Sequence, residues 1–294
     1  MNKFKVFKAI KHDDERYLLK NLKKDSQLVN ASIACSWTVM HEAAVHNRVN
    51  MIKILVQEGS TVIDAPNSAN RTPMFLAARK GHVSAVETLF RLGSQAIDSL
   101  NETRHLTPMH AATQEGHVST IEMLFRLGSK SIDTPSNCGW TPMHAAASGG
   151  FVSIIEMFVR LGSTNIDAPN NQGWTPMHVA ACHGHVSVIE TLVRLGSTAI
   201  DALTKDNQSL LYVALMNKRW QCVKVLRELG ADCSIARLSS LTPKHLKHLN
   251  EPIDESESAE TRYGIYFDRS CVSRLLFHLD TAKCPSPSTR HLLE

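Results

Sequence analysis

A four-residue motif, Thr-Pro-Met-His, recurs along the chain at nearly constant spacing. Its four clear copies begin at Thr72, Thr107, Thr141 and Thr175, and the first has Phe in place of His. The spacings are 35, 34 and 34 residues, and weaker copies begin one period earlier at Thr38 and one period later at Ser209. Residues 137–170 and 171–204 are identical at 23 of 34 positions, so the units arose by duplication. Repetition at this period predicts a repeat architecture rather than a single globular core.

Each unit carries the signals for two short helices. In residues 171–204, the Thr-Pro pair at Thr175 is a helix start, with a hydroxyl cap followed by Pro at the first helical position. We expect a first helix over residues 176–182, ended by Gly184 in a left-handed cap. Apolar residues at helical spacing predict a second helix over residues 186–195. A unit this small cannot bury its apolar surface alone, so the copies must stack into a solenoid.

The unit text TPMHxAA, followed by GHVSVIETLVRLG, resembles the ankyrin repeat, whose signature is T-P-L-H-x-A. The resemblance covers residues 36–238 and implies an all-α ankyrin-repeat solenoid of stacked helix-turn-helix units. The six repeats expected from it span about 36–69, 70–104, 105–138, 139–172, 173–206 and 207–238. The period is 34 rather than the family's 33, so we expect one extra residue in the loop between repeats.

The two ends of the chain differ from the central repeats. Residues 1–35 predict a degenerate N-terminal capping repeat with a polar outer surface. Residues 239–281 predict a partial C-terminal repeat or cap that includes an acidic loop at 251–260. Residues 282–294 predict a flexible tail.

Composition excludes several classes of protein. The seven cysteines form no CxxC pair, which favours a reducing compartment over a disulfide framework. The net charge of +4 lies in residues 1–36, and the neutral remainder is unlike a nucleic-acid binder. No apolar run approaches the roughly 20 residues of a membrane span, and the N-terminus lacks the apolar core of a signal peptide. We therefore expect a cytoplasmic monomer without stable membrane insertion.

No catalytic or metal-binding motif is complete. The segment HEAAVH begins at His41, but its second histidine, His46, stands five residues later, whereas the zinc-protease motif needs a spacing of four. Cys182, His183 and His185 cluster without a second ligand pair at zinc spacing. The sequence therefore predicts no enzyme, no catalytic residue, no metal site and no cofactor.

One histidine recurs three residues after the capping Thr in most repeats. The central copies are His110, His144 and His178. No Ser, Cys or carboxylate partner recurs beside them, as nucleophilic or acid–base catalysis would need. The resemblance to ankyrin repeats implies a structural role instead, in which each imidazole hydrogen-bonds near the Thr and braces adjacent repeats.

Specificity is expected at the positions that differ between otherwise similar repeats. In ankyrin proteins the loop tips and the exposed end of the first helix line a groove that binds partner proteins. The resemblance assigns these positions to the candidate partner-binding residues Trp37, Arg71, Arg79, Lys80, Leu106, Gln114, Glu115, Trp140, Trp174, Cys182 and His183.

Two groups among these candidates have alternative interpretations. Three tryptophans stand at the loop-tip position. Trp and Arg are frequent interface hot spots, but Trp also packs on neighbouring loops, and the sequence leaves both roles open. Arg71, Arg79 and Lys80 indicate either an acidic partner or a solvated charged surface.

The function expected from the resemblance is a non-enzymatic protein–protein interaction module that uses the concave groove. An alternative hypothesis is an effector that an intracellular bacterium exports into the host-cell cytoplasm without a cleavable signal peptide. A third hypothesis places a small modifying activity in residues 251–294, which contain Asp254, Cys271 and His278.

Overall fold

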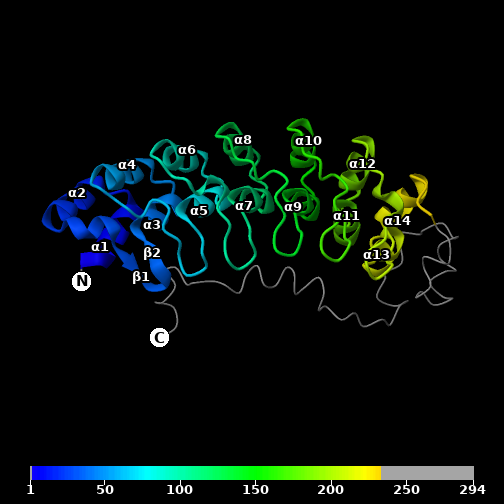
Figure 1. Ribbon diagram of the computed structural model, residues 1–294, viewed down its shortest axis with the longest axis horizontal. Helices are drawn as coiled ribbons and strands as arrows, with labels where there is room; N and C mark the ends of the chain where they lie inside the picture. The colour runs from blue at the N-terminus through cyan, green and yellow to red at the C-terminus, as the bar shows by residue number, and fades with distance from the viewer. Residues whose placement is uncertain (1, 233–294) are drawn as a thin grey trace. The chain divides into compact units, whose positions relative to one another are not determined.

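The computed structural model describes residues 2–232, which fold into pairs of short antiparallel helices (Figure 1). The prediction of an all-α solenoid is confirmed. The first helices of the pairs are α1 (Asn2–His12), α3 (Val39–Val45), α5 (Pro73–Arg79), α7 (Pro108–Gln114), α9 (Pro142–Gly149), α11 (Pro176–His183) and α13 (Leu210–Met216). The second helices are α2 (Glu15–Lys24), α4 (Val49–Gln57), α6 (Val83–Arg91), α8 (Val118–Arg126), α10 (Val152–Arg160), α12 (Val186–Arg194) and α14 (Trp220–Glu228).

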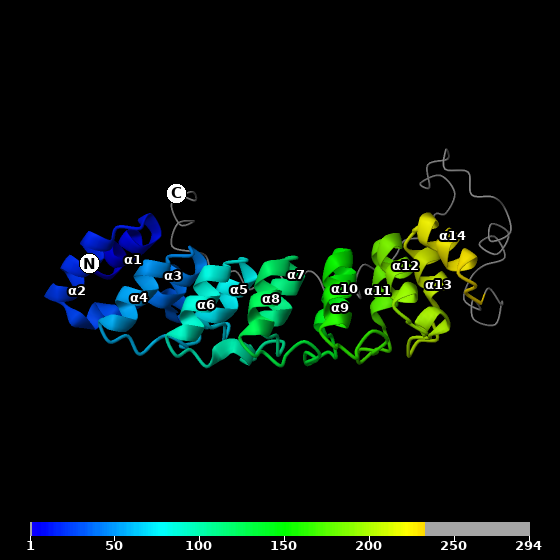
Figure 2. The same cartoon turned by 90° about the horizontal axis from the view of Figure 1, so that it is seen from above.

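Like helices stack on like helices. The helices α3, α5, α7, α9, α11 and α13 contact one another in order and form one row, and α4, α6 and α8 lie side by side in a second row with α10, α12 and α14 (Figures 1 and 2). The long loops extend from the row of first helices, on the side away from the second helices (Figure 1). This arrangement gives the described chain two surfaces: an inner surface of first helices and loops, and an outer surface of second helices.

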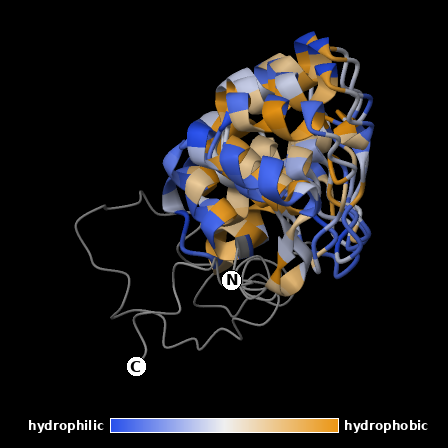
Figure 3. Cartoon of the chain, turned by 90° about the vertical axis from the view of Figure 1, so that its left-hand side faces the viewer, coloured by the Kyte–Doolittle hydropathy of each residue, from blue (hydrophilic) through white to orange (hydrophobic). Residues whose placement is uncertain are grey.

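The first helices begin and pack as the sequence signals require. The hydroxyl residue of the motif is the N-cap in all six repeats, and Pro follows it in the four clear copies. The Met of the motif is fully buried in every copy that carries it: Met40, Met74, Met109, Met143 and Met177. Small alanines follow in each first helix, which lets neighbouring first helices approach closely. Apolar side chains from both rows form one continuous core, and many of the loop residues are hydrophilic (Figure 3).

The N-terminal pair α1–α2 stacks on α3 and α4 as a further unit. A short antiparallel hairpin follows it, made of β1 (Ser32–Ile33) and β2 (Trp37–Thr38). The predicted partial repeat at 239–281, its acidic loop and the tail at 282–294 lie outside the described residues.

A histidine hydrogen bond joins neighbouring repeats on the inner side, which confirms the structural role predicted for these histidines. In the fourth repeat, the Thr141 backbone N–H donates to Nδ1 of His144 at 3.2 Å, so Nε2 carries the proton and donates to the carbonyl of Trp174 at 2.9 Å. Three further histidines make the same bond to a carbonyl 30 residues ahead: His41 to Arg71, His110 to Trp140 and His178 to Gln208. We call this contact the histidine brace.

The second repeat lacks the histidine brace because Phe75 replaces its histidine. Phe75 packs instead with Leu76, Leu106 and Ala111 in an apolar cluster separate from the main core. The same junction has one additional loop residue, and Asn101 holds this longer loop by accepting from the backbone N–H groups of Arg104 and Leu106, both at 3.1 Å. The contact between the second and third repeats is therefore apolar at the loop entry.

A second series of hydrogen bonds joins the repeats where the second helices end. Asp133 accepts from the Ser163 hydroxyl at 2.5 Å and from the Thr164 backbone N–H at 2.9 Å, one repeat further along. The corresponding aspartate–serine pairs are Asp64 with Ser94, Asp98 with Ser129, and Asp167 with Ser197. The serine of the Gly-Ser pair and the aspartate of the Ile-Asp pair, which set this chain apart from the common repeat, thus bond between successive repeats. We call this series of aspartate–serine contacts the aspartate ladder.

The histidine brace makes stability depend on pH. Burial lowers the pKa of His41, His110, His144 and His178 to about 4, from 6.5. The unfolded chain therefore takes up protons as the pH falls below about 6.5, while the folded chain does not until about 4. We expect full stability above pH 6.5 and a progressive loss between pH 6.5 and 4, at about 1.4 kcal/mol for each pKa unit of each histidine. Urea unfolding followed by circular dichroism at pH 7.5, 6.0 and 5.0 measures this, and an unchanged midpoint contradicts it.

The aspartate ladder predicts that two carboxylates, both facing a neighbouring repeat, contribute very differently to the free energy of unfolding. Replacing Asp133 with Ala leaves a hydroxyl and a backbone N–H without their charged acceptor and is expected to cost about 1–3 kcal/mol. The control is Glu122→Ala, because Glu122 faces Arg160 at 3.8 Å across an exposed surface, and such pairs contribute less than about 1 kcal/mol. Urea unfolding compares the two variants, and equal losses contradict the prediction.

Candidate functional site

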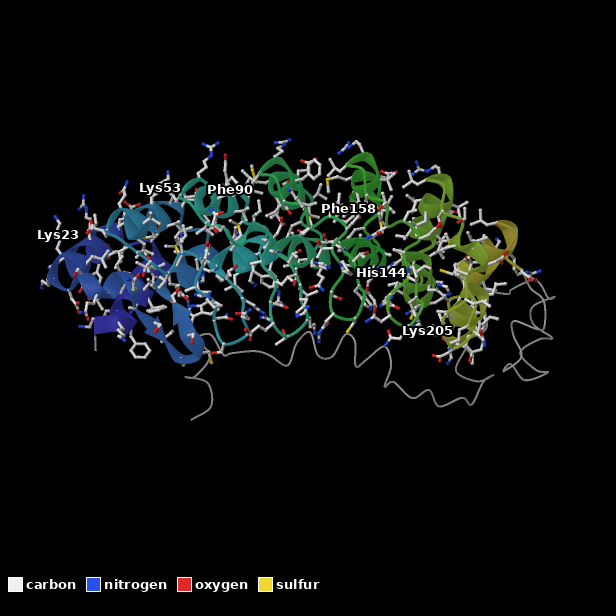
Figure 4. All side chains as sticks on the ribbon, in the orientation of Figure 1. Lys23, Lys53, Phe90, His144, Phe158 and Lys205 are labelled. Atoms are coloured by element: carbon white, nitrogen blue, oxygen red, sulfur yellow. The ribbon has the colours of Figure 1, made fainter. Side chains whose placement is uncertain are left out.

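The inner surface holds every candidate residue that the sequence analysis selected. Trp37, Arg71, Leu106, Trp140 and Trp174 lie where a loop enters a first helix. The others lie where a first helix ends: Arg79, Lys80, Gln114, Glu115, Cys182 and His183. Figure 4 shows this division with labelled side chains, since His144 lies among the first helices and Lys205 near the loops, whereas Lys53 and Phe90 lie on the second helices.

The three loop-tip tryptophans are half-buried against the brace histidines of their own repeats. The ring centroids are 5.3 Å apart for Trp37 and His41, 5.5 Å for Trp140 and His144, and 6.1 Å for Trp174 and His178. The backbone carbonyls of Trp140 and Trp174 also accept the histidine brace of the preceding repeat. Each loop tip is therefore held by a hydrogen bond and a ring contact before any partner arrives.

The ends of the first helices are fixed as well. The ring of His117 donates to the carbonyl of Arg79 at 3.1 Å, and that of His185 to the carbonyl of Ser148 at 2.9 Å. Arg219 replaces the histidine in the last repeat, and its Nε donates to the carbonyl of Cys182 at 3.0 Å. Phe151 stands at the same position in the fourth repeat and packs beside Gly149 and Gly116. Turn and helix end thus form one preformed unit in each repeat.

Trp37 has a partner that the sequence analysis did not identify. Its indole Nε1 donates to Oε2 of Glu42 at 2.9 Å, and Nε2 of His46 lies 3.2 Å from Oε1 of the same carboxylate. Glu42 is 6% exposed. The available signal was that Glu42 is the one acidic residue at the fifth position of the motif, where other repeats have Leu, Ala or Val. We call these three residues the Trp–Glu–His cluster.

The same contacts explain why HEAAVH is no zinc motif. Both ring nitrogens of His41 are engaged, Nδ1 by Thr38 and Nε2 by the carbonyl of Arg71, and Glu42 is paired with Trp37 and His46. Within residues 2–232 no group of three or more His, Cys, Asp or Glu side chains is placed to hold a metal ion.

The predicted basic group is partly neutralised within the chain. Nε of Arg79 lies 3.2 Å from Oε1 of Glu115 in the next repeat, and both side chains are partly exposed. Lys80 is exposed beside this pair, and Arg71 is half-buried. Two candidates of opposite charge thus form one polar feature that joins two repeats.

Two candidates present little surface. Leu106 is 6% exposed, within the apolar cluster around Phe75, and Cys182 is 4% exposed. Burial raises the pKa of the Cys182 thiol above its ordinary value, so the thiol is the favoured form. Both side chains therefore serve packing more than contact with a partner.

Comparisons with known proteins agree with this architecture. The family model for ankyrin repeats (3 copies) matches residues 6–99, 93–167, 109–206 and 153–237, and the chain therefore belongs to the ankyrin-repeat family. Among solved structures, the ankyrin repeat domain of human ASB11 superposes with a TM-score of 0.65 and 23% sequence identity, over 75% of this chain and 96% of that one. At that identity the likeness concerns the fold alone. No curated protein sequence gives a significant match.

Ankyrin repeats are generally protein–protein interaction modules, and their fold is typically a non-enzymatic binding scaffold. None of the helices in residues 2–232 is long and apolar enough to cross a membrane.

The Trp–Glu–His cluster gives a spectroscopic prediction. Replacing Glu42 with Ala removes the acceptor of the Trp37 indole N–H, so this proton should exchange with solvent faster and its cross-peak should move upfield in a ¹H–¹⁵N correlation spectrum. The cross-peaks of Trp140 and Trp174 should stay in place. Glu115→Ala serves as the control, because it removes an inner-surface carboxylate whose partner is Arg79. A Trp37 cross-peak that is unchanged in Glu42→Ala contradicts the hydrogen bond.

Proposed function

We propose that this protein binds a partner protein through the inner surface, with the loop tips and the ends of the first helices as the contact region. The observation that carries the proposal is that these variable side chains stand on a backbone fixed by repeated hydrogen bonds, the histidine brace at the loop and the ring-to-carbonyl bonds at the turn. A surface fixed before binding loses little conformational entropy on association.

The two surfaces also differ in chemistry. The outer surface carries ion pairs between neighbouring second helices, such as Glu156 with Arg194 at 2.5 Å, and one serine and one glutamate recur at the same positions of α6, α8, α10 and α12. The inner surface changes from a charged pair at Arg79 and Glu115 to small residues at Ser148 and Gly149, and then to His183. In the central repeats the inner surface therefore varies in charge and size while the outer surface keeps a common pattern, as is typical of a specific binding site on a repetitive scaffold.

The half-buried tryptophans are the strongest contact candidates. Trp140 and Trp174 each contact a buried histidine ring of their own repeat and remain partly exposed. A rigid, amphipathic ring of this kind adds contact area at low entropic cost, which is why Trp is frequent among interface hot spots. Packing and contact are therefore compatible roles for the same side chain.

The test is affinity capture from eukaryotic and bacterial lysates, read by quantitative mass spectrometry, with three folded baits. These are the wild type, the Trp140→Ala/Trp174→Ala double variant and an outer-surface control, Phe125→Ala, whose ring is 36% exposed. We expect a partner that the wild type and the control capture equally and that the double variant loses by about tenfold or more, as removal of hot-spot residues does.

Capture of the same proteins in the same amounts by all three baits overturns the proposal. So does a loss that occurs only with Phe125→Ala, because it would move the binding surface to the second helices.

The export hypothesis has no support in residues 2–232 or in the comparisons, and the modifying activity in residues 251–294 lies outside the described residues.

A further inference from the structure

The N-terminal pair α1–α2 carries the excess positive charge of the chain. Residues 1–36 hold eight Lys and Arg residues against four acidic ones, while the remainder is neutral. The pair is the first unit of the stack, and α1 and α2 contact α3 and α4 (Figure 2). No further repeat lies before it in the described residues, so the helix faces turned away from the core carry exposed side chains.

One face of α1 is cationic around an exposed phenyl ring. Phe4, Lys8 and Lys11 are spaced four and three residues apart, so they follow one line along the helix, and Lys5 lies beside that line. The opposite face, which includes Ile10, packs into the core. Phe4 is 65% exposed, the highest value among the exposed large apolar side chains of residues 2–232. An apolar ring thus stands in water among lysines.

The exposed face of α2 is cationic as well. Four exposed cations lie opposite its buried leucines: Arg16, Lys20, Lys23 and Lys24. Figure 4 shows Lys23 projecting at this end of the stack. Packed helices lie about 8–10 Å apart, close to the Debye length of about 8 Å at physiological salt, so the two faces contribute to one positive field. We call these four cations, together with Phe4, Lys5 and Lys8, the basic end.

The acidic residues of this unit do not neutralise the basic end. They lie in the turn between the helices or beside the helix ends, and each has a partner. Asp13 pairs with Arg48 at 3.4 Å. The other three accept hydrogen bonds: Asp14 from the Tyr17 backbone, Glu15 from the Asn50 side chain and Asp25 from the Gln27 backbone. Within residues 2–232, none of the cations of the basic end forms an ion pair.

The cations of this unit are almost all lysines. Residues 1–36 hold seven lysines and one arginine, whereas the rest of the chain holds nine lysines and fifteen arginines. Protein interfaces are enriched in Arg and depleted in Lys, and Arg is also the preferred residue for reading nucleic acids. Lys is a hydrated point charge on a flexible stem, which suits a layer of lipid headgroups without fixed geometry. The type of cation therefore favours a lipid surface over a protein or a nucleic acid.

We propose that the basic end binds the surface of an anionic lipid bilayer, with the Phe4 ring entering the boundary between headgroups and acyl chains. Lys5 and Lys8 then meet the negative headgroups beside the ring, and the cations of α2 add attraction. Clusters of four to eight cations attract anionic lipids, and a buried apolar ring adds to that attraction. The contact is peripheral and reversible, unlike the stable insertion that the sequence excludes. It uses a surface other than the inner surface, so the two proposals are independent.

The experiment is co-sedimentation of the full-length protein with lipid vesicles. One set is pure phosphatidylcholine, and the other contains about 30% phosphatidylserine, which gives a negative surface like that of a cytoplasmic leaflet. We expect binding to the anionic vesicles alone. The affinity should fall about fivefold or more when the salt concentration rises from about 0.05 to 0.2 M, because the Debye length shortens.

The phenyl ring is tested by two substitutions and a matched control. Phe4→Ala should weaken binding to anionic vesicles about tenfold, and Phe4→Leu, which keeps an apolar group of similar size, should retain most of it. The control is Phe125→Ala, because Phe125 is also exposed and also precedes a cation, and it should bind as the wild type does. Since the replaced rings are exposed, circular dichroism should show the same helix content in all variants.

The lysines are tested by charge reversal. Lys5→Glu/Lys8→Glu should weaken binding to anionic vesicles about tenfold or more, because two attractions become repulsions. The control with the same net charge is Arg126→Glu/Lys205→Glu, which changes two exposed cations on α8 and a loop. It should lose less than about threefold, since surface attraction falls off within a Debye length.

Four results overturn the proposal: equal binding to neutral and anionic vesicles, a Phe4→Ala variant that binds like the wild type, an equal loss in both charge-reversal variants, and tighter binding to a polyuridine RNA than to anionic vesicles at equal phosphate concentration. The last result indicates a nucleic-acid surface instead. The Trp140→Ala/Trp174→Ala variant should bind vesicles as the wild type does. Loss of vesicle binding and loss of partner capture are therefore separate outcomes, and either proposal can fail alone.

Discussion

The hydrogen bond from a buried neutral imidazole to a carbonyl in the next repeat is the contact on which the inner surface depends. It is directional and sheltered from water, and it links positions 30 residues apart. In four of the repeats it therefore fixes the end of the following loop against the first helix of the preceding repeat. The imidazole suits this task because its two nitrogens differ, one accepting from the Thr cap of its own repeat and the other donating forward. One histidine side chain therefore both caps its own helix and aligns the next repeat.

The aspartate ladder complements this contact at the other edge of each unit. Carboxylates accept from a serine and a backbone N–H of the following repeat, so each interface is tied where the second helix ends as well as at the loop entry. Between the two ties lie methionine and alanine side chains, which fill space without imposing direction. The polar contacts set the angle between repeats, and the apolar ones supply most of the free energy of stacking.

The sequence predicts the repeated elements closely, because their signals are local. The expected helices at 176–182 and 186–195 are Pro176–His183 and Val186–Arg194, since the Thr-Pro start and the glycine end are properties of neighbouring residues. The inner-surface location of the candidates also follows from their place in the unit. Their partners do not, because Arg79 meets Glu115 from another repeat, and the burial of Leu106 and Cys182 depends on packing between units. The role of Glu42 could not be predicted from the sequence, because it depends on the position of the Trp37 indole, which donates to the Glu42 carboxylate.

Phe75 gives the chain one interface unlike its neighbours. Elsewhere a directional bond fixes two repeats at the loop entry, whereas here a phenyl ring meets Leu106 and Ala111 through contacts that tolerate small rotations. The outer tie remains, since Asp98 still accepts from Ser129. The bond at the helix end remains as well, since the ring of His117 donates to the carbonyl of Arg79 at 3.1 Å. The loop entry is therefore the part of this interface that relies on contacts without a fixed direction, and resistance to rotation there rests on the shape of the phenyl ring and its neighbours.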